Sequence, residues 1–300
     1  MSVLAHLFPS LAVTSPSLPS LPSLDFDTSR GKRTLQLDLR SSFADRSTFE
    51  RLVRTADVLL ESYRPGGLAS LGFGPERLRA LNPDIVLADL TAWGSVHGDA
   101  ACEGGPWSLR KGFDSLVQFA SGFGEAEGRA RSEWRRGREG EAGGRSECAP
   151  RALPCQVLDH ATGYLTACVP LSLSLPSHFP LLVSDIIFIL AVYRFGILAA
   201  LYHRSTSGGA FLVTTTLLDT ATWLRSLGRT DPSIEPFSNA LETQKELRAR
   251  GRTARLSGWE GKEVEYVKHA ARFEGDVEAG WTTAPTGYAD SAADWRARGE

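Results

Sequence analysis

The feature that most constrains the fold is a regular alternation of short apolar runs and helical segments between residues 34 and 90. The runs have the length of strands, and the segments between them carry apolar side chains at helical spacing. Asn82 and Pro83 end the last of these helices, because proline cannot continue one. Strands that alternate with helices favour an α/β fold with a parallel sheet. The predicted elements are strands at 34–39, 57–61 and 85–90, and helices at 47–56, 68–71 and 75–81.

The remainder of the chain adds elements of the same two kinds. Residues 211–216 combine aliphatic side chains with three threonines and follow the Gly208-Gly209 turn, which is typical of a strand. Further strands are predicted at 11–14 and 264–269, and further helices at 115–122, 161–167, 195–204, 217–227 and 239–250.

The composition is that of a globular protein with a sizeable core. Hydrophobic residues make up 42% of the 300 positions and charged residues 23%. The net charge is −2 and the isoelectric point is about 6.3, whereas a nucleic-acid-binding protein usually carries a basic face. We therefore expect no nucleic-acid partner.

The cysteines and the N-terminus bear on the compartment. The four cysteines contain no Cys-x-x-Cys pair and have no histidine at metal-binding spacing, so neither a disulfide framework nor a metal site is predicted. The first residues lack the basic segment that opens a secretory signal. We expect the cytoplasm or an organellar matrix and not secretion.

Composition shifts suggest three regions. We expect a Pro/Ser-rich N-terminal segment at 1–24, a large α/β domain at 25–227, and a partial small domain with a tail at 228–300. Within the large domain, residues 124–147 are polar and show no periodicity. This stretch predicts a disordered insertion.

A second insertion is expected at residues 168–194. It holds three prolines and an apolar run, and it interrupts a helix that would otherwise join 161–167 to 195–204. A membrane-contacting segment is the alternative. The uncharged core of the run covers only residues 186–193, and about 20 apolar residues are needed to span a bilayer, which argues against membrane insertion.

Asp159 is the residue at which we expect the chemistry. It follows the apolar residues Val157 and Leu158 and precedes a helical stretch, so the order predicts that Asp159 is the helix N-cap. The positive end of the helix dipole would lower its pKa and hold the charge outward. A capping aspartate is common, and its position alone assigns no function.

A series of short motifs occurs in a fixed order between residues 31 and 201. Together they resemble the class III CoA-transferases, the CaiB/BaiF family that also contains alpha-methylacyl-CoA racemases. The resemblance covers most of residues 25–225. It implies a Rossmann-like large domain that lacks its N-terminal part here, a smaller second domain, and an interlocked homodimer. The motifs are Gly31-Lys-Arg33 with Leu37-Asp-Leu39, Asp57-Val-Leu-Leu-Glu-Ser-Tyr-Arg-Pro-Gly66, Leu71-Gly-Phe-Gly74, Asn82-Pro83, Leu90-Thr-Ala-Trp-Gly94, Gly112-Phe-Asp114 with Gln118 and Ser121-Gly122, Asp159 with Gly163, and Gly196-Ile-Leu-Ala-Ala-Leu201.

The family resemblance implies that Asp159 is a nucleophile. Its carboxylate would attack the thioester of an acyl-CoA donor, and an aspartyl-CoA intermediate would then pass CoA to a carboxylic acid acceptor. Coenzyme A is thus a substrate, and no tightly bound cofactor is implied. Backbone N–H groups of a glycine-rich loop could stabilise the developing oxyanions.

The resemblance also suggests residues that bind CoA: Lys32, Arg33, Arg64, Trp93, Gly94 and Asp114. Three of them have an alternative role. Arg64 could instead bond nearby carbonyl groups, Trp93 could belong to the core or to a pocket wall, and Asp114 could cap a helix. His160 is expected on the surface, because adjacent helical residues point about 100° apart.

The sequence also departs from the family pattern. Racemase-type members carry a histidine where this chain has Phe113. A racemase needs two acid/base groups, so this change argues against racemisation. A racemase-like isomerase and a family remnant impaired in catalysis remain the alternatives to a CoA-transferase.

Overall fold

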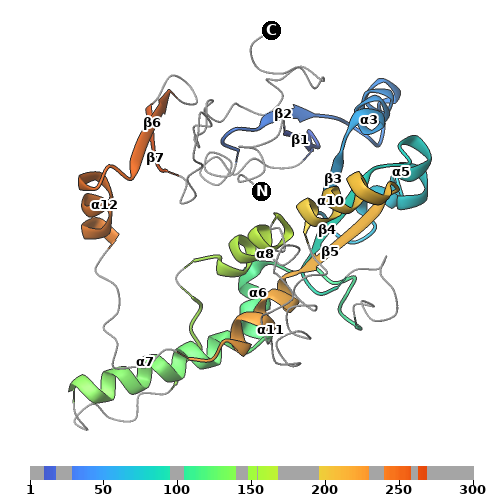
Figure 1. The fold of residues 1–300 in the computed structure, drawn as a ribbon. Helices are drawn as coiled ribbons and strands as arrows, with labels where there is room; N and C mark the ends of the chain where they lie inside the picture. The colour runs from blue at the N-terminus through green and yellow to red at the C-terminus, as the bar shows by residue number, and fades with distance from the viewer. Residues whose placement is uncertain are drawn as a thin grey trace, which may run out of the picture. The chain divides into compact units, whose positions relative to one another are not determined.

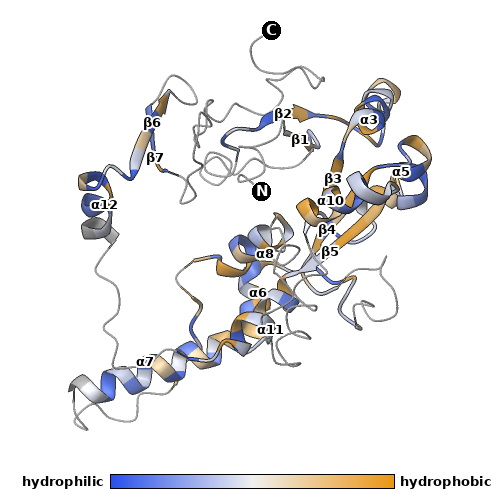
Figure 2. Ribbon diagram, viewed as in Figure 1, coloured by the Kyte–Doolittle hydropathy of each residue, from blue (hydrophilic) through white to orange (hydrophobic). Residues whose placement is uncertain are grey.

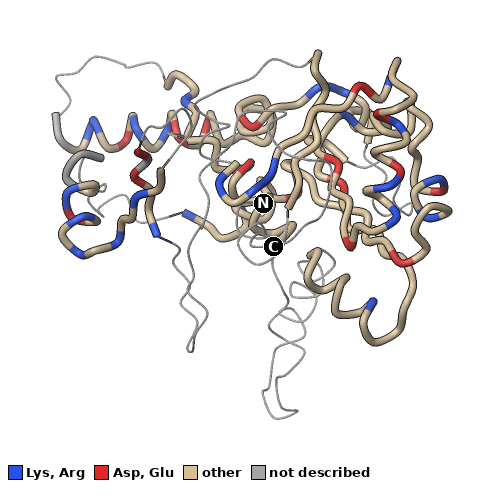
Figure 3. Tube along the Cα trace, turned by 90° about the horizontal axis from the view of Figure 1, so that it is seen from above, with Lys and Arg blue, Asp and Glu red and all other residues tan. Residues whose placement is uncertain are grey.

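The computed structural model describes eight parts of the chain, which group into two compact units. The first unit combines Met1–Thr55 with Pro236–Glu300, and the second is Ala56–Glu235. Figure 3 shows basic and acidic residues interspersed along the described parts, in keeping with the small net charge. The described residues are 10–17, 29–94, 105–139, 148–153, 155–167, 196–229, 240–257 and 263–268.

The described residues of the first unit form two small sheets and two helices (Figure 1). One sheet is parallel, with Leu11 opposite Arg33 in its register, and the other is antiparallel. Apolar residues on one face of α3, among them Phe49, Leu52 and Val53, are buried. The elements are β1 (Leu11–Thr14), β2 (Arg33–Gln36), α3 (Phe43–Thr55), α12 (Ala240–Ala249), β6 (Thr253–Ser257) and β7 (Glu263–Val267).

The second unit is organised around a parallel sheet in the order β3-β4-β5. The strands are β3 (Val58–Glu61), β4 (Val86–Thr91) and β5 (Phe211–Thr216). The central strand β4 is hydrogen-bonded on both sides, and its first three residues are fully buried. Figure 2 shows these strands among the most hydrophobic parts of the chain. Such continuous apolar runs are typical of parallel strands that are covered on both faces.

Helices surround this sheet. They are α4 (Gly67–Ser70), α5 (Pro75–Leu81), α6 (Asp114–Ala120), α7 (Phe123–Glu139), α8 (Val157–Ala167), α10 (Ile197–Ser207) and α11 (Leu217–Ser226). Helix α10 packs on β4 and β5, and α8 packs on β5, α6 and α11 (Figure 1). Trp93, Val117, Leu158, Leu217 and Ala221 form one buried cluster that joins α6, α8 and α11 to the end of β4.

Two pairs of buried threonines connect α8 to the strand and helix behind it. Thr162 donates from Oγ1 to Oγ1 of Thr220 over 2.8 Å, and the hydroxyl oxygens of Thr166 and Thr215 lie 2.8 Å apart. Buried hydroxyl groups need partners, and these pairs provide them within an otherwise apolar contact.

Most predicted elements are confirmed, with ends that differ by a few residues. The mixed α/β class and its parallel sheets are therefore established, while the Rossmann-like detail, the missing N-terminal part and the domain boundary at 227 stay predictions. The short antiparallel strand β6 was not predicted. No helix in the described part of the chain is long and apolar enough to cross a membrane.

The prediction of disorder at 124–147 is wrong for its first two thirds, where α7 forms. Glutamate, alanine and arginine favour helices, and Glu125 and Arg129 form an ion pair one turn apart. Gly128 allows the helix to approach the backbone oxygen of Ala149 more closely than a Cβ atom would permit. Residues 140–147 and the predicted insertion at 168–194 lie outside the described residues.

Arg204 of α10 provides a test of how the helix is attached to the sheet. Its guanidinium donates to the backbone oxygens of Asp57 and Asp84 and pairs with the Asp57 carboxylate over 2.6 Å. Arg204→Ala removes all three bonds, so urea unfolding should show a stability loss of about 1–3 kcal/mol. The control Arg129→Ala, which breaks only the exposed pair on α7, should change stability by less than about 0.5 kcal/mol. Equal losses in both variants would contradict this account.

Gly112 provides a second test, because it lies where a loop packs against the end of β4. A Cβ atom at Gly112 would overlap Ala92 and lie 2.7 Å from Nε1 of Trp93. Gly112→Ala should therefore lower the free energy of unfolding by about 1–3 kcal/mol through overpacking. A Cβ atom at Gly105 would meet nothing within 4 Å, so Gly105→Ala serves as the control. Similar melting temperatures for the two variants would rule out the close packing of this loop.

Candidate active site

Asp159 is the third residue of α8 and not its N-cap, which corrects the prediction from the sequence. The helix begins at Val157, and the backbone oxygen of Gln156 already accepts a helical bond from His160. The apolar pair Val157-Leu158, expected to precede the helix, forms part of its first turn, and Leu158 is fully buried in the core.

The pKa of the Asp159 carboxyl group is raised and not lowered, which is a second correction. The carboxyl group reaches solvent through the pocket, yet neighbouring protein atoms displace part of its hydration. This desolvation is the largest cause of the raised pKa, and the negative charge of Asp114 adds to it, while His160 acts in the opposite direction.

Asp114 and Gln118 hold the chain segment that enters α8. Both side chains are buried, with 1% and 2% of their surface exposed. Oδ2 of Asp114 accepts a 2.9 Å hydrogen bond from the backbone N–H of Asp159, and Oδ1 accepts one from Nε2 of Gln118. Gln118 in turn accepts from the N–H of Leu153 over 2.9 Å and donates to the oxygen of Cys155 over 3.2 Å. Asp114 thus caps α8, although it belongs to α6.

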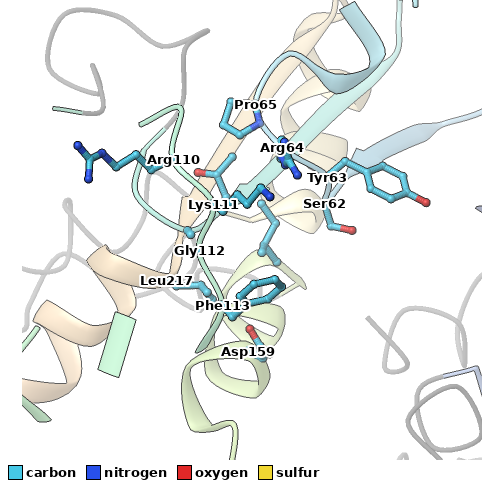
Figure 4. A pocket seen from close by; sticks show the side chains of 13 residues that line it. Ser62, Tyr63, Arg64, Pro65, Arg110, Lys111, Gly112, Phe113, Asp159 and Leu217 are labelled. Atoms are coloured by element: carbon cyan, nitrogen blue, oxygen red, sulfur yellow. The ribbon is translucent and has the colours of Figure 1, made fainter. Parts of the chain in front are cut away.

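Asp159 opens onto a pocket of about 310 Å³, a size within the range of small-molecule sites. The pocket lies at the carboxyl ends of β3, β4 and β5, where open α/β sheets place their ligands. In Figure 4, Phe113 lies at the Asp159 end of this pocket, while Arg110 and Tyr63 extend away from it. The lining residues are Ser62, Tyr63, Arg64, Pro65, Leu90, Thr91, Ala92, Arg110, Lys111, Gly112, Phe113, Asp159 and Leu217.

Three cations line this pocket, and only one of them was predicted. Arg64 follows β3, and its side chain forms no hydrogen bond or ion pair with any described residue. The described residues therefore do not support the alternative that Arg64 bonds nearby carbonyl groups. Arg110 and Lys111 precede Gly112 and were missed. Their position directly before the Gly-Phe-Asp motif is the signal that could have identified them. Arg110 also lies over the ring of Trp107, 5.4 Å from its centroid.

Trp93 and Gly94 follow β4 but do not line the pocket. Trp93 is buried in the core cluster, where its Nε1 donates to the oxygen of Lys111 over 3.1 Å and its ring meets Trp107 edge to face at 5.0 Å. The oxygen of Gly94 accepts a 2.9 Å bond from Thr91. Trp93 therefore belongs to the core, which was one of the two alternatives. The hydrogen bond from its indole also holds the loop that carries Lys111.

Lys32 and Arg33 belong to the first unit and lie at the start of β2. The backbone N–H of Arg33 bonds to Ser10 across the parallel pair, and burial lowers the pKa of Lys32 below its ordinary value. Their predicted role in CoA binding stays a prediction. In the part of the chain that the structure describes, no three His, Cys, Asp or Glu side chains gather as a metal site would require.

The arrangement combines a carboxylate that makes no hydrogen bond through its side chain to any described residue with a cationic, partly apolar pocket. A desolvated carboxylate is a stronger nucleophile than a fully hydrated one, and guanidinium and ammonium groups bind phosphates and carboxylates. The site can therefore bind an anionic substrate and attack an electrophilic carbon beside Asp159.

Comparison with known proteins shows the family to which the chain is similar. A family model for CoA-transferase family III matches residues 22–172, half of the chain. The "Probable fatty acyl-CoA transferase Rv3272" of Mycobacterium tuberculosis is 29% identical over 211 residues, which cover 70% of this chain and 40% of that protein. The succinate–glutarate CoA-transferase of Agrobacterium fabrum is 38% identical over 96 residues, 32% of this chain and 22% of that enzyme. The chain spans less than half the length of these curated relatives.

Solved structures share the fold. A crystal structure of Rv3272 superposes with a TM-score of 0.59 at 21% identity and covers 96% of this chain and 91% of that one. A CaiB/BaiF family protein from Brucella suis superposes with a TM-score of 0.51 at 19% identity, over 89% of this chain and 60% of that one. With the family model matched across the loops and helix that build the pocket, the conclusion is that this chain belongs to CoA-transferase family III.

Proposed function

We propose that this protein transfers CoA from an acyl-CoA donor to a carboxylic acid through a covalent intermediate on Asp159. The observation that carries the proposal is the pocket: Asp159 is the one carboxylate among its thirteen lining residues, and three cations share that lining. An anionic donor and an anionic acceptor could both be held there by Arg64 and Lys111, whereas the Arg110 side chain extends away from the pocket.

The proposed reaction needs no net proton transfer. The Asp159 carboxylate attacks the thioester carbon and expels the CoA thiolate, which gives a mixed anhydride. The thiolate then attacks the Asp159 carbonyl carbon, forms an aspartyl-CoA thioester and releases the donor acid. The acceptor carboxylate attacks this thioester and expels the CoA thiolate, which gives a second mixed anhydride. The thiolate then attacks the carbonyl carbon of the acceptor, forms the new acyl-CoA and releases the Asp159 carboxylate. Each step exchanges one acyl bond for another, so a difficult transfer is divided into easier ones.

The raised pKa of Asp159 supports the first step and limits its pH range. Partial desolvation makes the carboxylate less stable as an anion and therefore more reactive towards carbon. The same effect protonates Asp159 at a higher pH than an ordinary aspartate, so the attack weakens as the medium becomes acidic.

Arg64, Arg110 and Lys111 are the candidates for the negative groups of the substrates. Arg64 lies beside Pro65 in the loop after β3, and the other two lie in the loop before α6, so anion binding would draw on two separate loops. The relatives include transferases named for fatty acyl-CoA, for succinate and glutarate, and for acetyl-CoA and oxalate. These names give the first donors and acceptors to assay, and the homodimer implied by the family stays a prediction.

Replacement of Asp159 tests the proposal directly. Incubation of the protein with acetyl-CoA or succinyl-CoA should yield a mass increase on the peptide that contains Asp159. Asp159→Asn should reduce this adduct and the transfer rate by several orders of magnitude, because the nucleophile is gone. Asp219→Asn is the matched control, since Asp219 is also the third residue of a helix but does not line the pocket. Adduct formation in Asp159→Asn, or its loss in both variants, would refute the assignment.

Proton exchange separates transfer from racemisation. The lining residues include no histidine, and Phe113, which is 67% exposed beside Asp159, cannot carry a proton. A racemase must remove and return an α-proton through two groups. Incubation of a 2-methylacyl-CoA with the protein in D₂O should therefore give no detectable deuterium at the α-carbon. Deuterium exchange at the α-carbon that is faster than adduct formation on Asp159 would favour the racemase-like isomerase.

A further inference from the structure

Helices α8 and α11 each have an aspartate as their third residue, but the two are capped in different ways. In α11 the N-cap is Thr216, whose Oγ1 accepts a 2.9 Å bond from the N–H of Asp219 and donates a 2.8 Å bond to the Asp219 carboxylate. This reciprocal pair occupies the aspartate carboxylate within its own helix.

In α8 the residue before the helix is Gln156, and the N–H of Asp159 is bonded instead to Asp114 of α6, 45 residues earlier in the chain. The orphan donor of the first turn is therefore satisfied from outside the helix. The Asp159 carboxylate has no capping role to fill and lines the pocket. The hydrogen bond to Asp114 thus satisfies the N–H of Asp159 without using the Asp159 carboxylate.

Gln118 fixes the orientation of the capping carboxylate. Its amide nitrogen donates to Asp114 and to the Cys155 oxygen, and its amide oxygen accepts from Leu153. Rotation of the amide by half a turn would place a donor against the N–H of Leu153 and an acceptor against the oxygen of Cys155. The network therefore has one arrangement, and its two side chains are almost fully buried.

We infer that Asp114, oriented by Gln118, is a positioning residue that caps α8 in place of a local side chain and so keeps the Asp159 carboxylate free and aimed into the pocket. This inference rests on the proposed function of Asp159 as a nucleophile. Asp114 touches neither substrate nor reacting atoms. It acts through the backbone of Asp159 and through its negative charge.

Asp114→Asn tests both actions with almost no change of shape. An asparagine offers one acceptor oxygen where the network requires two, so either the N–H of Asp159 or the amide of Gln118 loses its partner and meets an N–H₂ group. The negative charge near Asp159 also disappears. The other titratable or charged side chains near Asp159 are His160 on its own helix and, in the pocket lining, Tyr63, Arg64, Arg110 and Lys111.

Three quantities should be measured for the wild-type chain and the variant: the rate of adduct formation on Asp159, its pH dependence, and the CoA concentration that gives half of the maximal thermal shift. In Asp114→Asn we expect adduct formation to slow by about 10- to 100-fold, as for a misplaced reactive group. The pH midpoint of the remaining reaction should move towards lower pH, because one cause of the raised pKa has been removed. The half-maximal CoA concentration should stay within about twofold.

Gln118→Leu separates the orientation of the Asp114 carboxylate from its negative charge. It also provides a second test of the inference in case Asp114→Asn does not fold. It removes the bonds to Asp114, Leu153 and Cys155 but keeps the Asp114 charge, so adduct formation should slow without a shift of the pH midpoint to lower values. Thr162→Val is the control for a lost buried hydrogen bond in the same helix. It should lower the melting temperature and leave both the rate and the midpoint unchanged.

The outcomes distinguish this inference from the proposed function. A wild-type chain that forms no adduct with any acyl-CoA would refute the nucleophilic role and the inference with it. A wild-type chain that forms the adduct, together with an Asp114→Asn variant of equal rate and equal midpoint, would overturn the inference alone. A Thr162→Val variant that matches Asp114→Asn in all three quantities would also overturn it, since any loosening of α8 would then suffice.

Discussion

The candidate site depends on one hydrogen bond, from the backbone N–H of Asp159 to the buried carboxylate of Asp114. A buried carboxylate is costly unless donors surround it, and here a helix N-terminus and the amide of Gln118 supply them. The bond joins α6 to α8 at the point where the pocket opens. The core beneath it, from Trp93 to Leu217, holds both helices against the end of β4. Packing sets the distance between the two helices, and the polar network sets their register.

The pocket follows from the topology of the second unit. Three parallel strands end at the same edge, and each passes into a loop or helix that supplies lining residues: Arg64 after β3, Ala92 after β4 and Leu217 directly after β5. The loop before α6 completes the lining, and it can approach β4 because position 112 has no side chain. The cations and the carboxylate thus come from segments far apart in the sequence.

Periodicity was sufficient to predict most strands and most helices, because buried strands and amphipathic helices have characteristic patterns of apolar residues. It failed for α7, where many charged residues and glycines hid a helix that is stabilised by side-chain pairs and a close backbone approach. The residue order suggested Asp159 as a helix N-cap but misplaced the helix start, because the apolar residues Val157 and Leu158 already belong to the first turn. The Asp114 bond and the raised pKa depend on contacts between distant residues, which local spacing does not encode.

The external cap on α8 also ties the Asp159 carboxylate to the fold that surrounds it. A peptide with only residues 155–167 would lack Asp114, so the N–H of Asp159 would lose the partner that it has in the folded chain. Under the function that we propose, labelling of Asp159 by an acyl-CoA would therefore report on the folded state of α6, a helix that the reagent never touches.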